Sequence, residues 1–121
     1  MNKRILVVED QEDNRRILRD LLTSAGFALL EATTGEEGVR LAKERRPDLI
    51  LMDIQMPVLD GYEATRQIKG DAALRGIPII VVTSYALSGD DAKASAAGAD
   101  AYVSKPFSPR ELLAKIRQFL P

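Results

Sequence analysis

Three carboxylates, one hydroxyl and one ammonium group stand where short apolar runs of the chain end. In chain order they are Glu9 and Asp10 after the first run, Asp53 after the third, Thr83 after the fourth and Lys105 after the fifth. If the runs are parallel strands, these side chains surround one crevice at the carboxyl edge of a sheet. Carboxylates packed together repel one another unless a cation lies between them. Mg²⁺ suits such a cluster because it takes oxygen ligands and keeps waters that a phosphate can replace.

The same residue types suit phosphoryl transfer. An aspartate carboxylate is a competent covalent acceptor of a phosphoryl group. Because the transition state spreads negative charge over the phosphoryl oxygens, positioning and charge neutralisation supply most of the catalysis. A lysine ammonium offers a point charge for one of those oxygens, and a threonine hydroxyl can donate to another. This chemistry needs no general base, which agrees with the absence of histidine from the chain.

The elements that must position these groups alternate between apolar runs and amphipathic segments. The runs are Ile5–Val8, Ala28–Leu30, Leu49–Met52, Ile77–Val82 and Ala101–Val103. The first, third and fourth are continuous and aliphatic, as parallel strands covered on both faces are. The second and fifth are shorter and more polar, which is typical of edge strands.

Helix signals fill the segments between the runs. The expected helix starts are Asp13, Thr34 with Glu37 in a capping box, Asp60, Ser88 or Asp91, and Ser108 with Pro109 and Glu111. Gly26, Gly70 and Gly98 stand near the ends of the first, third and fourth helices. We expect the basic residues of Arg15–Arg19 to form a solvated helix face.

Five strand-then-helix units imply a parallel sheet with helices on both faces and right-handed crossovers. With the three most apolar strands in the middle, the strand order is 2-1-3-4-5, that of the doubly wound, flavodoxin-like α/β fold. Ligands of that fold bind between strands 1 and 3, where the winding direction reverses. We therefore expect one (βα)5 domain over residues 1–121, with no separate output domain.

Composition excludes several other classes of protein. The chain has 17 basic and 18 acidic side chains among 121 residues, whereas a protein that binds nucleic acid through its phosphates normally carries a basic surplus. Without cysteine it has no disulfides and no thiol chemistry. Its apolar runs are far shorter than the roughly 20 residues needed to cross a bilayer. We expect a cytoplasmic domain that neither binds nucleic acid directly nor inserts into a membrane.

The segments Glu9–Asp10, Asp53–Gly61, Thr83–Ser84 and Lys105–Phe107 resemble those of the receiver domains of two-component response regulators. The resemblance covers essentially the whole chain, with the order and spacing of the motifs intact. It implies that Asp53 receives a phosphoryl group from a histidine on a separate histidine kinase or histidine phosphotransfer protein.

The resemblance also implies a metal site. Asp10, Asp53 and the backbone carbonyl of Gln55 would bind Mg²⁺. Glu9 would act mainly through water. An aspartate is also common at its position in the family, so the longer glutamate should move this carboxylate outward without removing it. Gln55 stands, in addition, where the family varies the lifetime of its phosphoryl group.

The remaining roles concern the phosphoryl group and the output. Thr83 and Lys105 would hold the phosphoryl oxygens, and the bond before Pro106 would be cis. Tyr102 would be the rotating aromatic of a switch, although a static edge-strand side chain is an equally good interpretation of it. The signal would leave through the face built by the fourth helix, fifth strand and last helix, by changing its affinity for a downstream protein. A monomer or weak dimer is expected.

Three alternatives stay open from the residues. An aspartyl-nucleophile phosphohydrolase would need an acid two residues after Asp53, where Gln55 cannot transfer a proton. A flavin or nucleotide binder would need a Gly- or Ser/Thr-rich loop after the first strand, whereas Glu9–Asp13 is mostly acidic. A pseudo-receiver used only for docking would have lost a carboxylate or the lysine, and none is lost.

Overall fold

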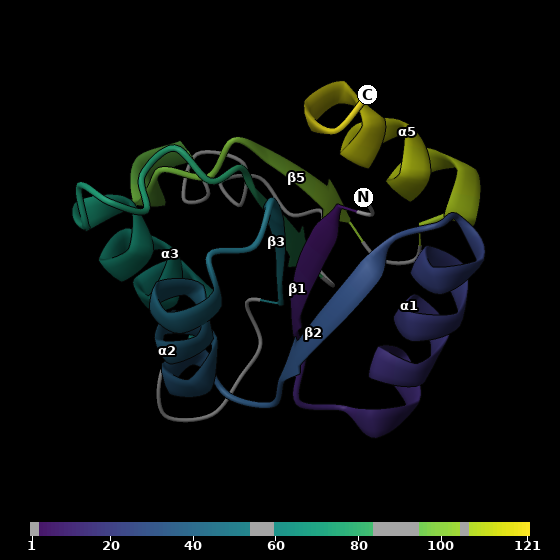
Figure 1. The fold of residues 1–121 in the computed structure, drawn as a ribbon, viewed down its shortest axis with the longest axis horizontal. Coiled ribbons are helices and arrows are strands. Elements are labelled where there is room, and N and C mark those ends of the chain that lie inside the picture. The colour runs from purple at the N-terminus through teal and green to yellow at the C-terminus, as the bar shows by residue number, and fades with distance from the viewer. Residues whose placement is uncertain (1–2, 54–59, 84–94, 105–106) are drawn as a thin grey trace.

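Strands and helices alternate along the chain (Figure 1), for which the computed structural model describes residues 3–53, 60–83, 95–104 and 107–121. The strands are β1 (Arg4–Val8), β2 (Ala28–Ala32), β3 (Leu49–Asp53), β4 (Ile79–Thr83) and β5 (Ala101–Ser104). The helices are α1 (Glu12–Ser24), α2 (Gly35–Arg45), α3 (Gly61–Gly70) and α5 (Pro109–Phe119). The expected fourth helix falls largely outside the described residues. None of the helices in the described ranges has the length and apolarity that a membrane span requires.

The five strands form one parallel sheet in the order β2-β1-β3-β4-β5. This confirms the predicted topology, with the more polar runs at the two edges. The winding direction reverses between β1 and β3. Because these two strands pair in parallel, their carboxyl ends lie side by side. The sheet therefore brings together the residues that follow them.

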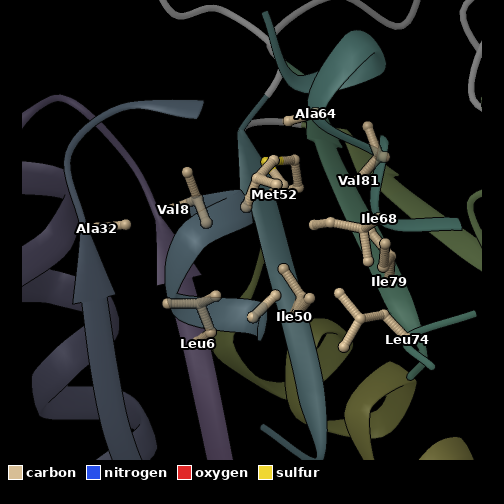
Figure 2. Packing of buried hydrophobic residues seen from close by; sticks show 12 residues of the cluster. Leu6, Val8, Ala32, Ile50, Met52, Ala64, Ile68, Leu74, Ile79 and Val81 are labelled. Carbon is tan, nitrogen blue, oxygen red and sulfur yellow. The ribbon is translucent and has the colours of Figure 1, made fainter. Parts of the chain in front are cut away.

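The core lies on both faces of the sheet because successive strand residues point to opposite sides. Leu6 and Val8 belong to the cluster that also contains Ile68 of α3, whereas Ile5 and Val7 belong to the cluster with residues of α1 and α5. Figure 1 shows α2 and α3 on one side of the sheet and α1 and α5 on the other. Figure 2 shows the first of these clusters, in which strand and helix side chains point toward one another. Burial on both faces explains the continuous apolar runs of the central strands.

Three of the predicted helix starts are confirmed by side-chain caps. Thr34, Asp60 and Ser108 each accept a hydrogen bond from the backbone N–H three residues later, at 3.0, 2.9 and 3.0 Å. The prediction for α1 is wrong: the helix begins after Gln11, which makes no side-chain cap, and Asp13 lies inside the first turn. The chain enters this helix only a few residues after β1, before it reaches Asp13. An acid in the first turn still interacts favourably with the helix dipole.

Candidate functional site

Strand register places the acidic residues beside one another at the carboxyl edge of the sheet. The last pair between β1 and β3 is Val8 with Met52. The residues that follow this pair, Glu9 and Asp53, therefore lie next to each other across the two strands. Asp10 follows where the chain leaves the sheet, so acids from two strands meet where the winding reverses.

Glu9, Asp10 and Asp53 form a compact cluster, with one carboxylate oxygen from each lying within 4.8 Å of the others. Glu9 is 1% exposed and Asp53 is 4% exposed. The backbone N–H of Gln11 donates to Oε2 of Glu9 at 3.2 Å. Oδ1 of Asp10 is buried and has no hydrogen-bond partner among the described residues.

This arrangement fits a divalent cation. Two like charges about 4 Å apart repel by roughly 4 kcal/mol at an effective dielectric constant of about 20, so the cluster carries a repulsion that a cation would relieve. Its donors are all carboxylate oxygens, the ligands of Mg²⁺ and Ca²⁺ rather than of softer metals. The buried Oδ1 of Asp10 is an acceptor suited to such an ion. The residues therefore fit Mg²⁺.

Of the other predicted site residues, Thr83 is described through its backbone alone. It ends β4, one residue beyond the strand partner of Asp53, and so stands at the same edge of the sheet. Gln55, Lys105 and Pro106 lie outside the described residues, and with them the predicted carbonyl ligand, the ammonium and the cis bond.

Tyr102 lies in the edge strand β5 and is 41% exposed. It lines a groove of about 280 Å³ together with Val103, Ser104, Glu111 and Lys115. The groove therefore joins β5 to α5, two of the elements that form the predicted output face.

The prediction that the basic residues of Arg15–Arg19 form a solvated face is wrong for Arg15, whereas Arg19 keeps 38% of its side chain exposed while it pairs with Glu31. The Arg15 side chain is only 12% exposed, and its Nη1 donates to the backbone carbonyl of Glu9 at 2.9 Å. Arg19 donates from Nε and Nη2 to the two carboxylate oxygens of Glu31, at 2.8 and 2.7 Å. This pairing raises the pKa of Arg19 and lowers the pKa of Glu31. Both arginines face Glu31 because β2 lies beside α1. The spacing of residues within the helix sequence does not predict this contact between two elements.

Residues 5–117 match the family model of the response regulator receiver domain. The chain is 42% identical to the polar-differentiation response regulator DivK of Brucella anthropi, over 99% of this chain and 98% of the relative.

Two solved structures resemble the molecule closely. The receiver domain of sensor histidine kinase PA1611 from Pseudomonas aeruginosa, with magnesium ion coordinated in the active site cleft, is 38% identical with a TM-score of 0.92, over 99% of this chain and 98% of that one. A chain of the co-crystal structure of the Saccharomyces cerevisiae histidine phosphotransfer signaling protein Ypd1 and the receiver domain of its downstream response regulator Ssk1 is 31% identical with a TM-score of 0.90, over 98% and 88%. With the sheet order and the acidic cluster, these matches show that the chain belongs to the response regulator receiver domains of two-component signalling.

Proposed function

We propose that this receiver domain accepts a phosphoryl group on Asp53 with the help of Mg²⁺. The observation that carries the proposal is the cluster of three carboxylates within 4.8 Å in a member of this family. Asp53 is the acceptor because it ends the central strand β3, between β1 and β4. Glu9 and Asp10 then serve the metal from one side, together with the backbone carbonyl of Gln55.

The proposed donor is a phosphohistidine of a histidine kinase or a histidine phosphotransfer protein, and the similarity to the Ypd1–Ssk1 structure supports a partner of this kind. A carboxylate oxygen of Asp53 attacks phosphorus, the phosphorus–nitrogen bond breaks, and the imidazole keeps the electron pair and takes up a proton. Thr83 and Lys105 hold the phosphoryl oxygens. Bound Mg²⁺ supplies positive charge that offsets the negative charge gathered at the site.

The proposed outcome is a change of shape and not steady turnover. Thr83 moves toward the phosphoryl group and Tyr102 turns inward, which changes the affinity of the face around β5 and α5 for a downstream protein. The groove beside Tyr102 lies on that face, which supports this assignment. Gln55 offers no proton for rapid hydrolysis, so the domain acts as a signalling module whose only reactions are its own phosphorylation and dephosphorylation.

The test is incubation with an acyl phosphate and Mg²⁺, followed by intact-mass measurement. We expect one added phosphoryl group, which does not appear when the metal is chelated before the phosphodonor is added and is absent from Asp53→Asn. Asp60→Asn is the matched control, because Asp60 caps α3 and asparagine caps helices equally well; this variant should label normally. Labelling of Asp53→Asn at the wild-type level contradicts the proposal, and steady release of phosphate from a generic ester would indicate a phosphohydrolase instead.

A further inference from the structure

The backbone carbonyl of Glu9 receives its hydrogen bond from a side chain of α1. On the other side of the residue, the Glu9 N–H donates to the carbonyl of Ala32 in β2 at 3.0 Å, which is ordinary sheet pairing. The Glu9 carbonyl oxygen accepts from Nη1 of Arg15 at 2.9 Å. Buried backbone acceptors at the end of a strand need such partners. Arg15 supplies one for the carbonyl of Glu9, the first residue after β1.

The Arg15 guanidinium is itself held on several sides. Nη2 pairs with Oε2 of Glu12 in the first turn of α1, and Nε lies 3.6 Å from Oε1 of Glu31 in β2. Its side chain is 12% exposed. Because two carboxylates face the guanidinium, most of its charge is balanced locally. Its contact with Glu9 therefore acts on the metal site through orientation more than through charge.

The carbonyl that Arg15 holds belongs to the peptide between Glu9 and Asp10. A peptide unit is planar, so fixing its carbonyl also fixes the N–H and the Cα of Asp10, the atom from which the Asp10 side chain starts. Oδ1 of Asp10 has no hydrogen-bond partner in the described part of the chain. Since no hydrogen bond in that part holds this oxygen, its position depends more strongly on where the backbone places the Cα of Asp10.

We propose that Arg15 is a positioning residue for the magnesium site: by holding the Glu9 carbonyl, it keeps the Asp10 carboxylate turned toward Glu9 and Asp53. The inference rests on the proposed function and adds a residue that the metal never touches. Groups that orient metal ligands typically change metal affinity by about 10- to 100-fold when they are replaced.

The experiment is a calorimetric titration of Mg²⁺ into metal-free variants of the whole chain. Arg15→Met keeps an apolar stem but cannot donate, so we expect the Mg²⁺ dissociation constant to rise about tenfold. Arg19→Met is the matched control: Arg19 lies on the same helix and binds the same Glu31, but no hydrogen bond joins it to Glu9 among the described contacts. We expect its affinity for Mg²⁺ to equal that of the wild type.

A second measurement on the metal-free proteins separates positioning from general destabilisation. The amide of Asp10 shares a peptide with the Glu9 carbonyl, so its NMR shift should move in Arg15→Met and stay in place in Arg19→Met. If Arg15→Met does not fold, Arg15→Lys replaces it, because lysine keeps the charge but lacks the planar fork that reaches several acceptors at once. Arg15→Lys should then bind Mg²⁺ more weakly than the wild type.

Unchanged Mg²⁺ affinity in the Arg15 variant, or an equal loss in the Arg15 and Arg19 variants, overturns the positioning role while leaving the proposed function intact. A wild-type protein that binds no Mg²⁺ overturns both.

Discussion

At the scale of single residues, Asp10 is a carboxylate of the site whose burial is energetically unfavourable. A buried carboxylate oxygen is costly unless a hydrogen bond or a cation satisfies it, and Oδ1 of Asp10 lacks a hydrogen-bond partner in the described ranges. Its neighbours in the cluster, Glu9 and Asp53, are acids too. In the proposed function, a metal ion would offset this concentration of negative charge and let a phosphoryl group bind there.

We predict that Asp10→Asn stabilises the metal-free protein and weakens its response to Mg²⁺. Removing one negative charge should raise the free energy of unfolding by between about 1 and 4 kcal/mol, the range for unit charges 4 Å apart between bulk water and a protein surface. The gain on adding Mg²⁺, which in the wild type follows mass action, should shrink. Urea unfolding with chelator and with Mg²⁺ measures both quantities.

Asp13→Asn is the control, since the Asp13 side chain is 87% exposed and lies outside the cluster. It should show neither the stabilisation nor the weaker response to Mg²⁺. A less stable metal-free Asp10→Asn protein that keeps the full gain from Mg²⁺ would contradict the charge argument.

At the scale of elements, the close approach of α2 to β1 supports the strand that carries the acids. A Cβ built on Gly38 of α2 would lie 2.8 Å from Cγ2 of Val8. Val8 directly precedes Glu9. Glycine is thus needed at this helical position for space, although its helix propensity is poor. The sequence predicted the start of this helix from its cap but carried no signal for the contact, which depends on the packing of two elements.

We predict that Gly38→Ala destabilises the protein. The gain of about 1 kcal/mol in helix propensity is outweighed by overpacking, which typically costs about 1–3 kcal/mol. Gly70→Ala is the matched control, because a Cβ on this residue of α3 meets nothing within 4 Å, and it should be neutral or stabilising. Urea unfolding distinguishes the variants; equal stabilisation by both would contradict a tight contact between α2 and β1.

The link between α1 and β2 predicts a pH dependence. Hydrogen bonding to Arg19 lowers the pKa of Glu31 below its ordinary value of 4.5. The folded-state pKa is depressed, so the stabilisation is complete above the unfolded pKa and is lost as the pH falls through the folded pKa. The difference in unfolding free energy between the wild type and Arg19→Met should therefore be present at neutral pH and vanish in acid. A difference that grows on acidification would contradict the pairing.

At the scale of the whole molecule, the sequence predicted the architecture well and the detailed contacts poorly. The central strands were recognisable because burial on both faces leaves continuous aliphatic runs, and their order alone predicted that Glu9, Asp10 and Asp53 converge. Arg15 was missed because its contact with the strand end depends on the reach of one side chain across elements. Ile17 of α1 is likewise 61% exposed, which its apolar residue type does not signal.

The sheet offers a short path from the acidic cluster to the proposed output face. Asp53 pairs with β4, and β4 pairs with β5, where Tyr102 lies opposite Val81. In a two-state switch, moving the population from 1:99 to 99:1 takes about 5.5 kcal/mol of preference for one state. In the proposed function, Thr83 couples the phosphoryl group to that change.

We predict that Thr83→Ala still accepts phosphoryl on Asp53 but loses the response of Tyr102. NMR signals of the Tyr102 ring should shift on phosphorylation in the wild type and stay unchanged in the variant. Thr33→Ala, an exposed threonine near the opposite edge of the sheet, is the matched control and should respond as the wild type does. A full Tyr102 response in Thr83→Ala would contradict the coupling.

The most direct measurement of the central claim identifies the phosphorylated atom chemically. Borohydride reduces an aspartyl phosphate to homoserine, which peptide sequencing then locates. After treatment with acyl phosphate and Mg²⁺, we predict homoserine at position 53 alone, and none when the metal is chelated. Homoserine at another aspartate, or an equal yield without Mg²⁺, would contradict a metal-assisted phosphoryl site at the carboxyl end of β3.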